Sequence, residues 1–476
     1  MSESPFWENC FTPRCSGTTM SLENVNLDRG FFQFTKPYQW IGWVVWVLGL
    51  LAILFGAAML STPGGLIAAF GFLLIALTSP ASLEADLHQV RKSAPQPDDL
   101  EEEALKNGYE LESWFFGRSS YSPTNDPNDW ILPAPGPSTW NKEDRYAPDG
   151  DGTPLPEHPS NVGTPRPATF STFGICMFLF IVLMSVSIGM LMIDQQAAID
   201  SGEVLDEEAG MEYAPIAITV IGLIWLLLGF FQHKRQQQMI DTPTSLVRSV
   251  AVGSAELVGQ VRPSQEQWIN VVVDGNHSRV IPGCVEFSWE YEVYVCRQVT
   301  STDSEGNTTT REECTWRTIR SDKGGVPFML HDGTGGIRVE STTFKRKSLG
   351  NFIKRWTSNH ADTLRDHFKT EFAARLFSQG DVRKHRWTAY ALRIGNPIYL
   401  LGMVKSRTQA ELAAENIDGT IGHTTIAVHG EDSPGMKANI QRGTELANLG
   451  RIRSSVELLT LPIVCVLAGI LLFALL

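Results

Sequence analysis

Apolar runs without charged residues alternate with polar segments along the chain. Four of these runs approach or exceed the roughly 20 residues that a helix needs to cross a bilayer core of about 30 Å. They cover residues 40–61, 170–193, 214–231 and 458–476. A helix satisfies its own backbone hydrogen bonds, so each run is expected to span the membrane. These runs exclude a wholly soluble globular protein.

A fifth apolar run is shorter. It covers residues 66–79 and follows Thr62-Pro63-Gly64-Gly65, which is a strong turn signal. Its length is compatible with a full span or with a re-entrant half-helix. We expect a tight two-span hairpin over residues 40–80, which brings the expected total to about five spans.

The segment 233–455 has a different pattern, with apolar and polar residues alternating at period two. The clearest example is 284–296, CVEFSWEYEVYVC, and the stretch 311–319 returns as its expected partner strand. Such alternation is typical of strands with one buried face. One helix is expected over 361–377, with Leu364, Phe368, Phe372 and Leu376 at four-residue spacing. The expected fold class is therefore a multi-pass α-helical membrane protein carrying a mostly β, barrel-like or sandwich-like α+β domain.

The pattern divides the chain into six parts. They are a tail (1–39), a two-span hairpin (40–80), an acidic, proline-rich linker (81–169), two spans (170–232) around an acidic loop (194–213), a β-rich domain (233–455) and a last span (456–476). The linker has eleven prolines between residues 122 and 167, a composition that disfavours a packed core. Trp130 and Trp140 are candidates for docking on the membrane or on the β-rich domain. An extended linker is favoured over a partner-binding tether.

The distribution of charge indicates an orientation. The formal net charge is −13, yet the loop 194–213 has seven acids and no Lys or Arg. The bases lie in residues 1–39 (3), 81–170 (7) and 233–455 (29). With five spans, one orientation places every base on the same side of the membrane. Basic flanks are retained in the cytoplasm, so we expect the large domain to be cytoplasmic.

Several strand segments of 233–455 form a recognisable series: 246–253 with 255–261, Trp289-Glu-Tyr-Glu-Val293, Trp316-Arg-Thr318, 326–339 and 395–402. In order and spacing this series resembles the GIDE domain, or beside-a-membrane domain, of MULAN-type membrane E3 ubiquitin ligases. In that family the domain also lies between two membrane helices. The resemblance covers about 160 residues and leaves out the first three spans and the proline-rich linker.

The ligase activity of that family resides in a RING finger, which needs eight Cys or His ligands for two zinc ions. The seven cysteines of the chain (Cys10, Cys15, Cys176, Cys284, Cys296, Cys314 and Cys465) form no CxxC pair. The resemblance therefore implies a RING-less relative, without zinc or another cofactor and without ubiquitin transfer of its own.

Two of these cysteines are candidates for a disulfide. Cys296 and Cys314 are equidistant from Glu305 in the expected hairpin, so they can face each other across two strands. A cytoplasmic pair should stay reduced. We therefore expect the disulfide only if the domain is not cytoplasmic.

The candidate membrane-interface site is the basic and aromatic stretch 344–356, FKRKSLGNFIKRW. Its apolar residues Leu349, Phe352, Ile353 and Trp356 have helical spacing, and its bases are Lys345, Arg346, Lys347, Lys354 and Arg355. Such a stretch can lie in the headgroup region and attract anionic lipids. The alternative is a helix that covers the open end of the β-rich domain. The glycine-rich stretch 331–336 lacks the Lys-Ser/Thr of a P-loop, so a β-turn is expected there.

No catalytic pattern or metal-ligand spacing stands out, so no catalytic or metal-binding residue is assigned. The expected function is a non-catalytic membrane scaffold or sensor that presents a GIDE-like domain at the bilayer surface. Its expected partners are the lipid bilayer, with anionic lipids as candidates, and an unidentified membrane or cytoplasmic protein, but no nucleic acid. A component of a membrane E3 ubiquitin ligase system and a membrane enzyme of unknown chemistry remain as alternatives.

Overall fold

The computed structural model forms two compact units. The β unit contains described residues of 94–162 and 244–445, and the membrane unit contains those of 15–93, 163–243 and 446–476. The structure describes residues 27–93, 128–132, 134–136, 140, 144–163, 165–200, 213–241, 244–266, 268–302, 308–363, 366, 368–372, 374, 380–417, 422–446 and 453–474.

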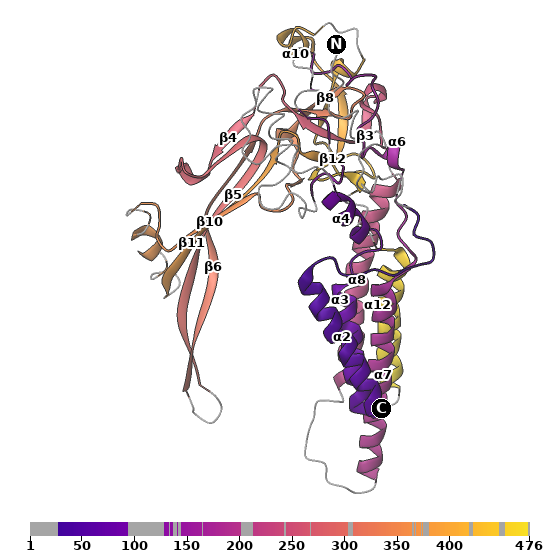
Figure 1. Cartoon of the computed structure of the whole chain (residues 1–476). Coiled ribbons are helices and arrows are strands. Elements are labelled where there is room, and N and C mark those ends of the chain that lie inside the picture. Colours follow the sequence, from indigo (N-terminus) through magenta and orange to yellow (C-terminus); the bar gives the residue numbers. More distant parts are fainter. Residues whose placement is uncertain are drawn as a thin grey trace. The chain divides into compact units, whose positions relative to one another are not determined.

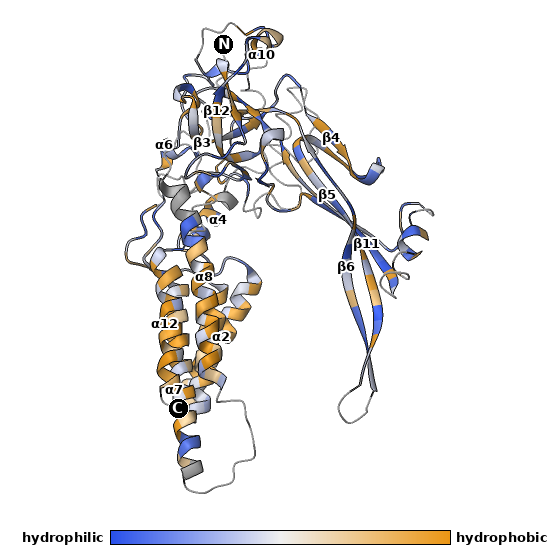
Figure 2. Ribbon diagram, turned by 180° about the vertical axis from the view of Figure 1, so that it is seen from behind, coloured by the Kyte–Doolittle hydropathy of each residue, from blue (hydrophilic) through white to orange (hydrophobic). Residues whose placement is uncertain are grey.

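Four helices of the membrane unit are long and apolar enough to cross a membrane. They are α2 (Trp40–Met59), α7 (Thr172–Asp200), α8 (Ala214–Asp241) and α12 (Ser455–Phe473). A shorter apolar helix, α3 (Thr62–Thr78), follows α2. Figure 2 shows that apolar residues dominate these helices. The four long runs of the sequence thus correspond to helices, whereas the fifth run forms a helix of 17 residues.

Small residues bring neighbouring helices of this unit close together. A Cβ atom added to Gly49 of α2 would lie 2.8 Å from the carbonyl oxygen of Gly71 in α3. Farther along α2, a Cβ on Gly56 would lie 2.6 Å from the backbone nitrogen of Ala68. Residue numbers rise along α2 while those of their contacts fall along α3, so the two helices are antiparallel. Close contact at small residues is a common way for membrane helices to associate.

The pair α8 and α12 packs in the same manner. A Cβ on Gly222 would lie 2.9 Å from the backbone nitrogen of Val466, and one on Gly469 would lie 2.8 Å from that of Thr219. These contacts also run in opposite directions along the two helices. The bundle is therefore held by backbone-to-backbone proximity as well as by large apolar side chains such as Leu461.

Polar residues that flank the helices form a collar at one end of the membrane unit. Tyr38, before α2, donates a hydrogen bond to Glu84, after α3 (3.1 Å). Arg453, before α12, donates to the carbonyl oxygen of Ser79 (3.1 Å), and the Ser171 hydroxyl donates to Glu457 of α12 (2.7 Å). The collar consists of Arg29, Thr35, Tyr38, Ser79, Ser82, Glu84, Asp86, Ala168, Thr169, Ser171, Thr172, Arg453, Ser454 and Glu457.

Short elements flank the collar. Strand β1 (Phe32–Gln33) pairs in parallel with β2 (Phe170–Ser171), which leads directly into α7. Helix α4 (Glu84–Ser93) follows α3. The start of α2, the end of α3 and the starts of α7 and α12 are thereby joined by hydrogen bonds within one region.

The β unit contains a seven-stranded sheet that closes on itself. The strand order is β13-β8-β7-β3-β12-β14-β9, and β13 also pairs with β12, which completes a ring. The strands are β3 (Gly253–Arg262), β7 (Phe328–His331), β8 (Gly336–Glu340), β9 (Lys347–Ser348), β12 (Pro397–Ser406), β13 (Ile426–His429) and β14 (Asn439–Arg442). The barrel-like ring encloses an apolar core that includes Leu257, Phe328 and Ile398. The expected barrel-like β domain is therefore present.

A second sheet has the order β10-β11-β5-β4, with β6 paired to β5. Its strands are β4 (Ile269–Val272), β5 (Val280–Thr302), β6 (Thr308–Gly325), β10 (Lys354–Ser358) and β11 (Asp381–Arg393). The period-two stretch 284–296 lies within β5, and 311–319 lies within β6, as the alternation predicts. Its core contains Val293, Trp387 and Ala391.

The remaining short helices of the β unit are α6 (Pro159–Val162), η5 (Val247–Ser249), η6 (Val273–Gly275), η7 (Ser341–Thr343), α10 (Gln409–Ala414) and η8 (Gly422–Thr425). Within the expected helix 361–377, the described residues 366, 368–372 and 374 are helical, whereas 361–363 are not, and Leu364 and Leu376 lie outside the described residues. Phe368 and Phe372 are 71% and 68% exposed, whereas Thr370 and Ala374 are buried. The side of this helix that faces the sheet therefore carries small residues, and the two phenylalanines do not pack into the core.

Candidate functional site: the arm and the polar clusters of the β unit

The most extended feature of the β unit is the hairpin of β5 and β6, which we call the arm (Figure 1). Strand β11 pairs with β5 only as far as Cys296, so the outer part of the arm has two strands. None of the residues of β6 is buried. Among the described residues β6 pairs with β5 alone, so its outer edge presents backbone groups that another strand can pair with.

Cys296 and Cys314 lie directly opposite each other in the arm and form a disulfide. The sequence predicts this facing arrangement from the symmetry of the hairpin. The disulfide links the two strands at the last residue of β5 that pairs with β11. The compartment that would keep it oxidised stays a prediction.

The same place offers a group of metal-ligand atoms. The sulfur atoms of Cys296 and Cys314 and a carboxylate oxygen of Glu312 lie within 4.8 Å of one another. Both sulfurs are used by the disulfide, and Glu312 forms an ion pair with Arg383. A metal ion would therefore require the reduced pair and the loss of that ion pair.

An aromatic stack supports the base of the arm. The rings of Tyr291 on β5 and Trp387 on β11 are stacked with centroids 4.8 Å apart, and the Arg279 guanidinium lies 3.5 Å from the Trp387 centroid. The indole N–H of Trp387 donates to Asp274 (2.9 Å), which also forms an ion pair with Arg320 of β6 (3.0 Å). Burial raises the pKa of the Tyr291 hydroxyl above its ordinary value. These contacts join β5, β6 and β11 to the segment that contains Asp274 and Arg279.

The predicted membrane-interface stretch 344–356 is not a helix. It contains β9 and the first residues of β10, joined by irregular backbone. Ile353 is buried in the core of the second sheet, where Trp356 also packs, while Leu349 packs against the barrel core. The expectation that Leu349, Phe352, Ile353 and Trp356 share one helical face is therefore wrong.

The bases of this stretch have contacts within the protein. Arg346 pairs with Asp432 (2.7 Å), and Lys347 pairs with Glu286 (2.5 Å). The Arg355 guanidinium lies 4.1 Å from the centroid of the Phe352 ring, and Lys354 lies 5.6 Å from that of Trp356. Lys345 lies near Asp432 and helps to lower the pKa of that carboxyl group. Binding of these side chains to anionic headgroups stays a prediction.

The proline-rich segment packs on the barrel through residues 144–158, which we call the strap. Asp149 of the strap forms two hydrogen bonds with the Arg262 guanidinium of β3, at 2.8 and 2.5 Å. The Leu155 N–H donates to the carbonyl oxygen of Asp332 (2.7 Å), and the Asp149 N–H donates to that of Gly333 (2.9 Å). Just before the strap, the buried Trp130 donates from its indole to the carbonyl oxygen of Gly395 (2.8 Å).

The glycine-rich stretch 331–336 is the turn between β7 and β8, as the sequence predicts. Asp332 accepts hydrogen bonds from the Thr334 N–H (2.8 Å) and hydroxyl (2.7 Å) and from the Val247 N–H (2.8 Å). A Cβ on Gly336 would collide with the carbonyl oxygen of Arg145 in the strap. The glycines therefore allow close approach of the strap, rather than forming a phosphate loop.

His331 lies beneath the strap and is neutral near pH 7. Its Nδ1 accepts from the Gly333 N–H (3.1 Å), so its Nε2 carries the hydrogen that it donates to the Ala147 carbonyl oxygen (2.9 Å). Burial, followed by the nearby Arg262, lowers the pKa of His331 to about 4. A protonated ring would have to give up the hydrogen bond from Gly333.

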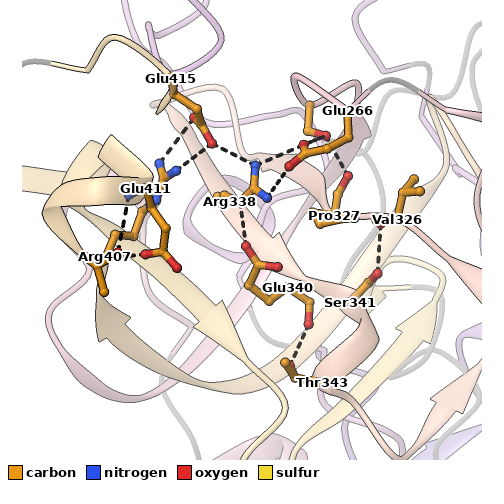
Figure 3. A network of polar contacts seen from close by, with 12 residues as sticks. Glu266, Val326, Pro327, Arg338, Glu340, Ser341, Thr343, Arg407, Glu411 and Glu415 are labelled. Carbon is orange, nitrogen blue, oxygen red and sulfur yellow. Dashed lines mark hydrogen bonds and ion pairs between the residues drawn. The ribbon is translucent and has the colours of Figure 1, made fainter. Parts of the chain in front are cut away.

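A second polar cluster surrounds Arg338 of β8 (Figure 3). Its side chain is 10% exposed, and its guanidinium contacts Glu266, Glu340 (2.5 Å) and Glu415 (2.8 Å). Glu415 also binds Arg407 (2.5 Å) and accepts from the Tyr146 hydroxyl (2.8 Å). The cluster joins the barrel, the residues after α10 and the strap. Each charged side chain of the cluster has a partner of opposite charge, which indicates a structural role.

Sequence reasoning missed these clusters. Asp149 and Arg262 are 113 residues apart, and Arg338 and Glu266 are 72 apart. No motif or periodicity connects such residues, because the contacts form only when the strap and the strands are folded. The available signal was the group of aromatic residues in the proline-rich segment, which pointed to docking without naming a partner.

Comparison with models of protein families, with curated proteins and with solved structures finds no match for this chain.

Proposed function

We propose that this is an integral membrane protein with five spanning helices and a large binding domain on one side of the bilayer. The single observation that carries the five-span topology is the collar. It joins Tyr38, before α2, to Glu84, after α3, so the chain returns at the end of α3 to the region where it entered α2. A hairpin with two complete crossings accounts for this return.

The length of α3 is compatible with that topology. Seventeen residues give a helix of about 25 Å, a few ångströms shorter than the usual hydrocarbon core. A short helix is accommodated by local thinning of the bilayer or by flanking residues. Helix α3 packs antiparallel to the longer, 20-residue helix α2, so the two helices lie alongside each other.

We propose that the β unit is a non-catalytic scaffold or sensor domain, and that the arm is its main protein-binding surface. Support comes from the outer edge of β6, which can accept an additional strand from a partner, and from the exposure of its side chains. The described polar clusters hold the strap and strands together instead of presenting reactive groups. The distribution of Lys and Arg favours a cytoplasmic position for this domain, whereas the Cys296–Cys314 disulfide favours an oxidising, non-cytoplasmic compartment. The two observations therefore point to opposite orientations.

We further propose that the β unit is a relative of the GIDE domain. The stretches that carry the resemblance fall on β3, β5, β6, the β7–β8 hairpin and β12, which are neighbours in the two sheets. The relation extends to a domain architecture rather than to ubiquitin transfer. Incubation with a charged ubiquitin-conjugating enzyme should give no conjugates, and autoubiquitination would revive the ligase alternative.

Shortening the arm tests the proposed binding role. Gln298 and Glu312 are paired across the arm, so residues 299–311 can be replaced by Asn-Gly, which favours a two-residue hairpin turn. The shortened protein keeps Cys296, Cys314 and the stack at Trp387. Both proteins are purified from native membranes in mild detergent, and the proteins bound to them are identified and quantified.

The shortened protein is expected to bind about tenfold less of the partner, or even less, than the protein with the full-length arm. A matched control replaces the exposed ion pair of Lys405 and Glu431 on the barrel with two glutamines and should retain the partner. Equal binding by the shortened and full-length proteins would show that the arm is not the binding surface.

A further inference from the structure

Two buried glutamates meet where the chain enters and leaves the β unit. Glu256 of β3 and Glu445, three residues after β14, are 0% and 4% exposed. The Thr244 hydroxyl lies 3.0 Å from Oε1 of Glu256 and 3.0 Å from Oε2 of Glu445. The Tyr399 hydroxyl of β12 donates to the other oxygen of Glu256 (2.8 Å).

The hydrogen bonds at this site require one proton more than two ionised glutamates would have. A threonine hydroxyl has one hydrogen, so it donates to only one of two carboxylates. It can meet the second at hydrogen-bond distance only by accepting, which requires that this carboxyl group carry a proton. The geometry therefore fits one ionised and one protonated glutamate, linked through Thr244.

The electrostatic surroundings favour that state. Burial raises the pKa of Glu256 to about 8. The hydrogen bond from Tyr399 lowers this pKa, the nearby Glu445 raises it, and the hydrogen bond from Thr244 lowers it by a smaller amount. Burial also raises the pKa of Glu445 to about 7. The groups acting on Glu256 are thus Tyr399 from β12, Thr244 from the entering segment and Glu445 from the leaving one. Two carboxyl groups in one site titrate as a pair, so the shared proton belongs to both.

The position of the pair suggests a consequence. Thr244 comes three residues after Asp241, the last residue of α8, and Glu445 comes ten residues before Ser455, the first residue of α12. The entering segment is also fixed by the Ser245 N–H, which donates to the carbonyl oxygen of Glu256 (2.8 Å). Thr244, Glu256 and Glu445 therefore tie together the two segments that connect the β unit to the membrane helices. We call this set the neck.

We infer that Glu256 and Glu445 form a proton-binding site that closes the neck, with one proton shared through the Thr244 hydroxyl. Loss of this proton leaves two buried carboxylates that repel each other, with a single threonine hydrogen between them. The closed neck binds more protons than an open neck, in which the glutamates have ordinary pKa values. Closure is therefore favoured at low pH and weakens as the pH rises towards the raised pKa values. This inference does not depend on the partner of the arm.

Hydrogen exchange of the full-length protein in detergent tests the inference. After correction for the intrinsic pH dependence of exchange, amides of 244–249 and 440–446 should lose protection by about tenfold between pH 6 and pH 9. Glu445→Gln and Glu256→Gln each replace one of the two titrating groups by a neutral hydrogen-bond donor, so each should reduce this pH dependence, and the double variant should remove it. Glu431→Gln, at an exposed ion pair, is the matched control and should behave as the wild type.

A second measurement detects the proton directly. At pH 7 the infrared spectrum should contain the C=O stretch of a protonated carboxylic acid, which disappears in the Glu256→Gln/Glu445→Gln double variant. Wild-type protection that does not change with pH would overturn the inference. So would a pH dependence in both single variants that is as large as in the wild type. Retention of the entire acid band in the double variant would also overturn it, even if the neck were otherwise intact.

Discussion

Asp149 illustrates at the residue scale how a proline-rich segment becomes part of a folded domain. Its carboxylate forms two hydrogen bonds with the Arg262 guanidinium, and the two side chains are 15% and 6% exposed. Removing one partner of such a pair leaves a buried charge uncompensated, which is strongly destabilising. The ion pair is therefore expected to hold the strap on the barrel.

Asp149→Asn should destabilise the β unit by about 3 kcal/mol. Denaturant unfolding of the full-length protein in detergent, followed by tryptophan fluorescence, measures the loss. Asp151→Asn is the matched control because Asp151 lies two residues away and is exposed. A loss of the same size in both variants would show that the ion pair is not the cause.

His331 should make the stability of the β unit depend on pH. Its pKa is lowered to about 4 in the folded protein, compared with 6.5 for an ordinary histidine, so the unfolded chain binds more protons between these values. The stabilising contribution is complete above pH 6.5 and is lost as the pH falls towards 4, with an upper limit of about 3 kcal/mol. Between pH 4 and pH 6.5, the slope of unfolding free energy against pH should be smaller in His331→Gln than in the wild type. An unchanged slope would contradict the assignment.

Helix packing gives a prediction at the element scale. A side chain at Gly56 of α2 would meet the backbone of α3 at Gly64 and Ala68. Gly56→Leu should therefore separate the helices and destabilise the membrane unit by about 1–3 kcal/mol. Thermal unfolding in detergent measures this effect. Ala57→Leu changes the adjacent, exposed position and should have little effect, so equal destabilisation would contradict close packing of α2 and α3.

The elements also indicate where sequence reasoning works. Period-two alternation over 284–296 predicts a strand because every second residue packs into a core: Val285 enters the barrel core, and Val293 and Val295 enter the core of the second sheet. The same reasoning fails for 344–356, where residues at helical spacing are divided between two sheets. Leu349 joins the barrel core and Ile353 the second core, so the spacing arises from two separate packing environments. Local periodicity cannot distinguish these cases.

At the scale of the whole molecule, the β unit is assembled from segments on both sides of α7 and α8. The strap precedes these helices, whereas the barrel strands follow them. The sequence predicts the long apolar helices and the β-rich character of the domain, since both leave regular patterns. It does not predict the ion pair of Asp149 with Arg262 or the meeting of Glu256 with Glu445. Those contacts depend on long-range folding.

The most direct test of the proposed architecture is a map of side-specific accessibility in native membranes. Single cysteines are introduced at Leu60, Gln89, Glu207 and Asp322 in a protein without its native cysteines, and labelled with an impermeant thiol reagent. Positions 60 and 207 should react from one side, and positions 89 and 322 from the opposite side. Reaction of positions 60 and 89 from the same side would show that α3 does not cross, and would contradict the five-span topology.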